Sequence, residues 1–417
     1  MKQKPALRLQ TKPWSRRHFL SLMGCLGLSA CRSGPLLFNP CRPARLPPHL
    51  ADHELVQQAF AGLRPEQVWD GHVHLLGLGD SGNGAWVNPA LRSLWHPLQY
   101  ARTHFYLNAS CANEDSADES FLARLLALKQ GFPAASRFML LAFDYSYDES
   151  GRRRLDLSAF HTPNALAARL HRDYPEQFEW AASVHPYRAD ALEALEQARN
   201  AGARAVKWLP PAMGMNPGAA RCDDFYAALV RLRLPLLTHG GDEHAVHGSR
   251  RQEYGNPLLL RRPLEHGVKV IVAHCASLGL GHDLDQGPNG PEVSNFSLFA
   301  RLLNDPRYEG RLFGDISAVI QRNRPAPVLQ TLLATEAWHS RLINGSDYPL
   351  PGVIPLISLR QLQHRGFLNN TAASVLSEVR QHNPILFDFM LKRLLRRGGK
   401  RFHATVFESR RVYGSVG

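Results

Sequence analysis

The sequence has no apolar run long enough to cross a membrane. The run near its start, Leu20 to Ala30, covers about half of the ~20 residues that a membrane-spanning helix needs. No internal repeat is present either. With 417 residues and the composition of a globular protein, the chain has room for one large or two ordinary domains.

Acidic residues are absent from the first thirty positions, which carry six lysines and arginines. Residues 392–417 carry eight basic residues against Glu408 alone, a net charge of +7. The two ends together account for the whole net charge of +13, so the chain between them is neutral. A neutral body gives no support to nucleic-acid binding, and we expect a small-molecule substrate instead.

The basic N-terminus has the pattern of a targeting segment. Ser15-Arg16-Arg17-His18-Phe19-Leu20 resembles a twin-arginine export motif, and Leu28-Ser29-Ala30-Cys31 resembles a lipobox. We therefore predict a signal peptide over 1–30 and a lipid anchor at Cys31. Arg32 resembles the pattern for outer-membrane sorting, which predicts a periplasmic lipoprotein. A Pro- and Arg-rich tether over 31–52, a body over 53–397 and a basic tail over 398–417 complete the expected organisation.

Cysteine is scarce, with six residues in the chain. Cys25 would leave with the signal and Cys31 would carry lipid, so four remain. An oxidising compartment permits disulfides among them, but their spacing does not give the connectivity. We expect Cys275 to be a small buried hydrophobe. The four are Cys41, Cys111, Cys222 and Cys275.

Strand-like and helix-like segments alternate from residue 66 onward, which predicts parallel βα units. A long insertion over 77–135 separates the first two strands, and a Gly- and Asn-rich loop over 277–295 is expected to cover the pocket. The expected strands are 67–76, 137–145, 178–185, 203–209, 234–239, 268–274, 312–319 and 341–347. The expected helices are 119–129, 164–173, 189–201, 223–232, 257–266, 326–335, 355–364, 370–380 and 384–397.

Residues able to bind a metal stand at the ends of several of these strands. His72 and His74 are two positions apart on the first strand, so their side chains point to the same side and can converge. Later apolar runs end in Lys207, His239, His274 and Asp347. A single buried histidine is usually a structural group, but this repeated pattern indicates a shared metal site.

This ordered set resembles the amidohydrolase superfamily, in particular its amidohydrolase-related branch. The resemblance extends over about residues 66–390 and implies an α/β fold: a (β/α)8 TIM barrel with a long insertion after strand 1 and extra C-terminal helices. The matching pieces are Asp70-Gly71-His72-Val73-His74, Val206-Lys207, Thr238-His239, Ala273-His274, Gly345-Ser346-Asp347-Tyr348-Pro349 and Asn383-Pro384 with Leu386-Phe387.

The resemblance implies one or two divalent metal ions. Neutral imidazoles and carboxylates suit Zn²⁺. In a two-ion site, His72, His74 and Asp347 would hold one ion and His239 and His274 the other, with a carboxylated Lys207 bridging them. In a one-ion site, His72, His74, His239 and Asp347 would hold the ion, and His274 would stand beside the water.

The expected reaction is hydrolysis of an amide, lactone or ester. A bound metal lowers the pKa of a water from about 15.7 toward 7. Asp347 would then accept a proton from that water and pass it to the leaving group. Two alternatives stay open: nonoxidative decarboxylation, which uses a similar one-metal site in the same branch, and a catalytically inactive, lipid-anchored binding barrel.

Overall fold

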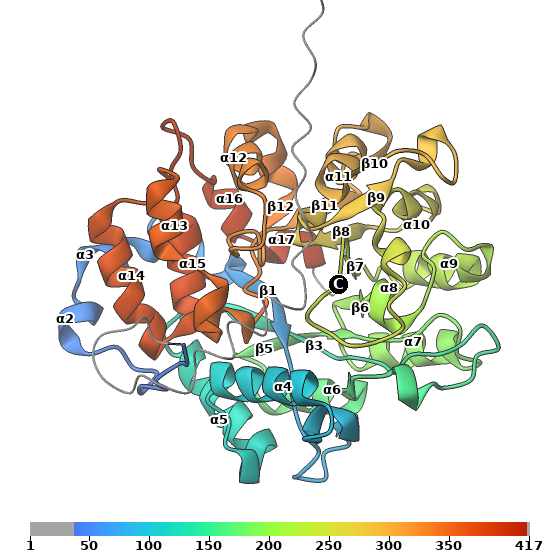
Figure 1. The fold of residues 1–417 in the computed structure, drawn as a ribbon, viewed down its shortest axis with the longest axis horizontal. Coiled ribbons are helices and arrows are strands. Elements are labelled where there is room, and N and C mark those ends of the chain that lie inside the picture. Colours follow the sequence, from blue (N-terminus) through green and yellow to red (C-terminus); the bar gives the residue numbers. More distant parts are fainter. Residues whose placement is uncertain (1–36, 415–417) are drawn as a thin grey trace, which may run out of the picture. The chain divides into compact units, whose positions relative to one another are not determined.

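A computed structural model describes residues 37–414, and their centre is an eight-stranded parallel sheet that curls into a barrel (Figure 1). Backbone bonds from Gly71 to Asn344, Asp347 to His72 and His74 to Tyr348 join the last strand to the first. The expected TIM barrel is therefore confirmed. In order around the barrel the strands are β1 (Trp69–His74), β3 (Arg137–Leu141), β5 (Phe178–Ala182), β6 (Ala205–Trp208), β7 (Leu236–His239), β8 (Val270–Ala273), β11 (Leu312–Asp315) and β12 (Leu342–Ile343).

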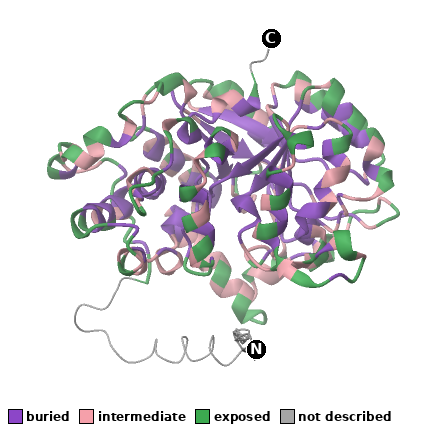
Figure 2. Cartoon of the chain, turned by 90° about the horizontal axis from the view of Figure 1, so that it is seen from above, coloured by how far each residue is buried: buried purple, intermediate pink, exposed green. Residues whose placement is uncertain are grey.

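Helices surround the strands, which lie buried at the centre (Figure 2). The helices that connect successive strands pack an apolar stripe on the sheet. In the helix that follows β6, Phe225, Ala228 and Leu229 form part of this stripe. The crossover helices are α6 (Asn164–Asp173), α7 (Ala191–Asn200), α9 (Asp223–Arg231), α10 (Arg261–Glu265), α11 (Asn295–Leu303) and α12 (Ala326–Ala334). None of the helices between residues 37 and 414 has the length and apolar character that a membrane span requires.

The insertion after β1 forms its own layer beside the barrel. It contains the short strand β2 (Trp86–Val87), which pairs with β4 (Phe160–His161), and the helices α4 (Pro97–Ser110) and α5 (Ala117–Lys129). The sequence indicated only the second of these helices. The last helices are α13 (Leu359–His364), α14 (Asn370–His382), α15 (Pro384–Leu394), α16 (Ala404–Phe407) and α17 (Arg410–Tyr413).

The segment expected to be a free basic tail instead covers the end of the barrel at which the strands begin. Val412 and Tyr413 are buried and belong to the cluster that fills the barrel interior. The hydroxyl of Tyr413 donates a hydrogen bond to the Gly71 carbonyl, and its ring packs against Trp69. The segment packs on the barrel because its apolar side chains, which lie between the arginines, are buried there. The prediction of a tail over 398–417 was therefore wrong for its described part.

The expected tether also differs from the structure. Residues 1–36, with the predicted signal peptide and Cys31, lie outside the described residues. From residue 37 the chain packs on the body: Leu50 of α2 (Pro48–Ala51) is buried, and a disulfide joins Cys41 to Cys111 at the end of α4. Residues 37–52 are thus part of the folded unit, because a covalent bond and a buried side chain hold them there.

Candidate metal centre and active site

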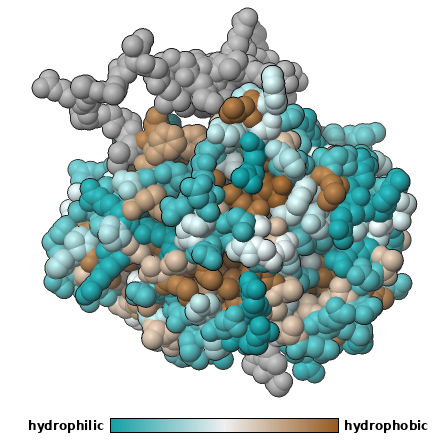
Figure 3. All heavy atoms as spheres, turned by 90° about the horizontal axis from the view of Figure 1, so that it is seen from below, coloured by the Kyte–Doolittle hydropathy of each residue, from teal (hydrophilic) through white to brown (hydrophobic). Residues whose placement is uncertain are grey.

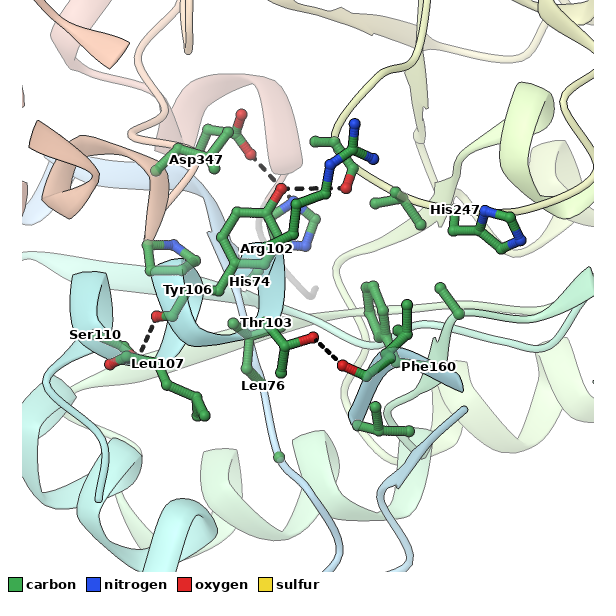
Figure 4. Close-up of a pocket in the computed structure, with 18 of the residues that line it drawn as sticks. His74, Leu76, Arg102, Thr103, Tyr106, Leu107, Ser110, Phe160, His247 and Asp347 are labelled. Carbon is green, nitrogen blue, oxygen red and sulfur yellow. Dashed lines mark hydrogen bonds and ion pairs between the residues drawn. The ribbon is translucent and has the colours of Figure 1, made fainter. Parts of the chain in front are cut away.

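Five of the six predicted ligands line one pocket at the end of the barrel where the strands stop. They are His74, Lys207, His239, His274 and Asp347 (Figure 4 labels the first and last). The sixth, His72, is fully buried directly beneath, within hydrogen-bonding distance of His74 and Lys207. The structure therefore brings together side chains that span positions 72 to 347.

The joint between the first and last strands positions Asp347. The Asp70 carboxylate accepts hydrogen bonds from the backbone N–H groups of His72 and Ser346. Gly345 lets the two strands approach, since a side chain there would place its Cβ 2.6 Å from the His72 Cβ. Asp347 itself has a left-handed backbone with φ of 59°, a conformation that side chains other than glycine seldom adopt away from functional sites.

The atoms around Asp347 are close enough to share an ion. Its Oδ1 lies 3.1 Å from His74 Nε2 and 3.4 Å from His72 Nε2, and its Oδ2 lies 3.8 Å from His274 Nε2. Ligand atoms of His72, His274 and Asp347 all lie within 4.8 Å of one another, so these three could hold a metal ion. No bond in this group requires a protonated imidazole.

Electrostatics favour the protonation states that metal binding requires. Burial, followed by the charge of Lys207, lowers the pKa of His72 well below its usual range, and burial does the same for His274. Burial raises the pKa of Asp347, but the charges and hydrogen bond of His72 and His74 outweigh it and bring that pKa to about 2. The site thus offers neutral imidazoles and an ionised carboxylate at pH 7.

Asp315 and Ser317 contact the Nδ1 atoms of two candidate ligands, His72 and His274. Asp315 Oδ2 lies 2.6 Å from His72 Nδ1, and the Ser317 hydroxyl lies 2.8 Å from His274 Nδ1 while donating to Asp315 Oδ2. Each imidazole therefore presents its Nε2 to the pocket. Such outer contacts set the tautomer and the basicity of histidine ligands. The sequence left the role of Asp315 open, because a lone carboxylate on a strand is often only structural.

Lys207 lies among these ligands, with its Nζ 3.2 Å from His72 Nε2. It is almost completely buried, and burial lowers its pKa to about 8 despite the nearby carboxylates Asp347 and Asp315. An appreciable fraction of the side chain is then an uncharged amine at neutral pH. This is the form that reacts with carbon dioxide.

His239 is buried, with both ring nitrogens close to polar atoms. Its Nε2 lies 3.2 Å from the Asp242 carbonyl, and its Nδ1, which makes no hydrogen bond within residues 37–414, lies 3.4 Å from Glu243 Oε2. Burial lowers the pKa of His239, which favours the neutral ring. Its ring packs edge-on against that of His274, which keeps His239 a candidate for a further ligand. The donor set as a whole therefore suits a divalent ion with nitrogen and oxygen ligands.

Other residues singled out in the sequence have varied positions. Glu243 and His247 line the pocket, and the buried Glu243 accepts hydrogen bonds from the N–H groups of Ala245 and Val246. His185 is buried away from the pocket and bonded through both ring nitrogens. The loop over 277–295 contributes no lining residue, so its expected place over the pocket was wrong. It forms a hairpin of β9 (Leu280–His282) and β10 (Glu292–Ser294).

Arg324, which lies on the loop after β11, belongs to no sequence motif. Its side chain is buried, and its Nε and Nη1 find no partner among the described residues. Burial lowers its pKa to about 10, while Asp347, Glu243 and Asp242 oppose that change. Its positive charge also contributes to the lowered pKa values of His239 and His274. The positive charge of Arg324 thus lies near the carboxylates of Asp347, Glu243 and Asp242, and it forms no ion pair with them in the described part of the chain.

We expect Asp315→Asn to weaken metal binding by about 10–100-fold, since an amide supports His72 Nδ1 less well than a carboxylate does. Competition with a chromophoric chelator measures this affinity. Asp283→Asn is the matched control. Asp283 lies between the two strands of the hairpin, pairs with Arg301 of α11 and does not line the pocket. Equal affinities for the two variants would contradict the role assigned to Asp315.

Comparison with known proteins gives a family match and several distant structural likenesses. A family model described as Amidohydrolase matches residues 69–358. No curated protein sequence matches the chain. Among solved structures, an uncharacterised TIM-barrel protein from Bordetella bronchiseptica is 17% identical, with 75% of this chain and 99% of that chain covered and a TM-score of 0.44.

Two further structures carry functional descriptions. A probable 2-pyrone-4,6-dicarboxylic acid hydrolase from Acinetobacter baumannii is 14% identical, with 75% of this chain and 92% of that chain covered and a TM-score of 0.40. A 5-carboxyvanillate decarboxylase from Sphingomonas paucimobilis is 10% identical, with 76% and 95% covered and a TM-score of 0.42. Likeness at this level leaves the reaction open.

Proposed function

Because the chain belongs to the amidohydrolase family, we propose that it is a metal-dependent hydrolase that cleaves an amide, lactone or ester bond of a small molecule. The observation that supports this best is the position of Asp347. Its carboxylate lies in the pocket beside the imidazoles of His72, His74 and His274, and its pKa of about 2 keeps it ionised at neutral pH. An ionised carboxylate in this position can accept a proton from a water.

A divalent ion bound by these residues supplies a water of lowered pKa and polarises a carbonyl oxygen. Asp347 accepts the proton of the attacking water and returns it to the leaving nitrogen or oxygen. His274, whose Nε2 lies 3.8 Å from Asp347 Oδ2, would contribute that nitrogen to the ion or accept a hydrogen bond from the water, because its Nδ1 faces Ser317. His72 and His74 hold Asp347 in place from the opposite side.

We further propose that the site holds two Zn²⁺ ions and that Lys207 is carboxylated. The amine of Lys207 would attack carbon dioxide, forming a C–N bond and releasing one proton to water. The support is its burial, its lowered pKa and its position between His72 and the ligands of the second half of the barrel. The carbamate would add two oxygens to the candidate donor set.

Metal content measured with activity tests both proposals. We expect about two zinc ions per chain, a 44 Da mass increase for carbon dioxide at Lys207, and hydrolysis of some members of a panel of lactones, amides and esters. One ion per chain, with carbon dioxide released from an aromatic acid and no hydrolysis, would establish decarboxylation instead. A purified protein that binds no added metal would favour an inactive binding barrel.

We propose that the protein is an exported lipoprotein, anchored to the outer membrane through Cys31. The motifs lie outside the described residues, and the supporting structural observation is the Cys41–Cys111 disulfide, since disulfides persist in oxidising compartments. Cys31→Ser is expected to move the protein from the membrane to the soluble fraction. An unchanged membrane fraction, or an intact N-terminus in the mature protein, would contradict the anchor.

A further inference from the structure

The pocket continues outward from the metal ligands into a space whose walls are apolar. The volume of the whole pocket, including the end that the candidate ligands line, is about 150 Å³. Five side chains that line it come from five separate segments: Leu76 after β1, Leu107 on α4, Phe121 on α5, Phe160 on β4 and Val246 on the loop after β7. Apolar groups converging from so many parts of the chain form a built cavity (Figure 4).

The polar side chains on these walls add little polarity, because backbone carbonyls already accept their hydrogen bonds. Thr103 donates to Leu91, Tyr106 to Ala245, and Ser110 to Tyr106. A polar substrate group placed there would lose its water and gain few new bonds, which costs free energy. This part of the pocket therefore selects against polar groups.

The inner end of the pocket has the opposite character. His74, Lys207, His239, His274 and Asp347 line it, and the pocket's polar lining also includes Gln99, Arg102 and His247. Two apolar side chains that precede α4 are exposed at the surface: Leu94 is 76% exposed and Trp95 is 91% exposed. Areas of this kind are visible among the polar surface in Figure 3.

We infer that the substrate carries an apolar group, a phenyl ring or a chain of about five or six carbons. This group is attached to the carbonyl carbon whose bond to the leaving group is cleaved. This inference rests on the proposed hydrolase function and adds its substrate class. The whole pocket, including the end that the candidate ligands line, has a volume of about 150 Å³, so the apolar group is no larger than a benzene ring or a chain of about six carbons. Compact, highly charged acids would leave these walls in contact with water.

Equilibrium binding of straight-chain carboxylates tests the inference without requiring turnover. The probes are acetate, butanoate, hexanoate, octanoate and decanoate, added to the metal-loaded protein in a calorimeter. Each buried methylene is worth a factor of about four in affinity. We expect affinity to rise by about that factor per carbon up to about six carbons and then to level off.

Two variants change the wall and one matched variant changes a distant surface. Leu107→Asn keeps the side-chain size but makes this wall polar, and we expect hexanoate to bind about tenfold or more weakly. Val246→Thr is isosteric and lies on a loop, so it tests the same wall if the first variant does not fold. Leu192→Asn, on α7 and 43% exposed, makes the same exchange away from the pocket and should leave affinity unchanged.

The outcomes separate this inference from the proposed reaction. Affinity that does not depend on chain length, or that falls equally in the Leu192 variant, would overturn the inference even if the enzyme hydrolyses acetyl compounds. The expected chain-length series without any hydrolysis would support the apolar subsite and count against the hydrolase. Faster hydrolysis of hexanoyl or benzoyl compounds than of acetyl compounds would support both.

Discussion

Replacing Asp347 by asparagine should lower turnover by about 10²–10⁴-fold, the range that a positioned proton acceptor supplies. The amide has nearly the same shape and keeps the barrel intact, but it cannot accept a proton at neutral pH. Turnover of the best substrate found in the screen is the measurement. Asp283→Asn is the matched control, because Asp283 pairs with Arg301 and does not line the pocket.

Metal content decides how a loss in the Asp347 variant is interpreted. Activity lost with metal retained places the effect on proton transfer, whereas activity lost together with metal identifies Asp347 mainly as a ligand. Near-parent turnover in a metal-loaded variant would remove Asp347 from the chemistry altogether, and with it the observation on which the proposed hydrolase depends.

Replacing Lys392 by methionine should lower the free energy of unfolding by about 3–5 kcal/mol, the cost of leaving a buried charge without its partner. Lys392 is fully buried, and its Nζ lies 2.6 Å from Asp388 Oδ2 and 2.7 Å from the carbonyl of Gly345. It thus supports the strand end that carries Asp347. Denaturant unfolding of the parent and the variant measures the difference.

The pH dependence of the Lys392 variant provides a second test. Burial raises the pKa of Asp388 above its usual range, and removing Lys392 raises it further. An acid with a raised folded-state pKa loses stability as the pH rises from its unfolded pKa toward that value, by at most about 1.4 kcal/mol per pH unit. The variant should therefore be closest to the parent near pH 4 and furthest above pH 7.

The double variant Asp388→Asn, Lys392→Met serves as the control. With the carboxylate gone, no charge is left buried, and the double variant should unfold at higher denaturant concentration than Lys392→Met alone. A single variant that stays within 1 kcal/mol of the parent at pH 8 would show that water reaches Asp388.

That the six candidate ligands lie close together was predictable because parallel strands end at one rim. A histidine, lysine or aspartate at the end of each apolar run must then face the same pocket, which made His239 and His274 interpretable without coordinates. Their supporting groups were not. Asp315 lies on a strand like many structural acids, and Arg324 follows no pattern, since only the folded chain places its charge near Asp347.

The ends of the chain were misjudged for a related reason. The net charge of +7 over residues 392–417 suggests an exposed segment, yet Lys392 is buried, where it contacts the Asp388 carboxylate and the Gly345 carbonyl. The residues around Cys41 were expected to be a tether on account of their prolines, and a disulfide that spacing alone could not identify fixes them instead. Long-range partners of this kind are properties of the tertiary structure.

The bond from Tyr413 to Gly71 joins positions separated by 342 residues. A ribosome synthesises β1 early, but this strand cannot reach its final surroundings until nearly the whole chain has emerged. Contacts so distant in sequence slow folding, because the intervening chain must first be ordered. The nascent protein would therefore keep Trp69 exposed until Tyr413 has emerged from the ribosome. Chaperones could bind the unfinished barrel during that interval.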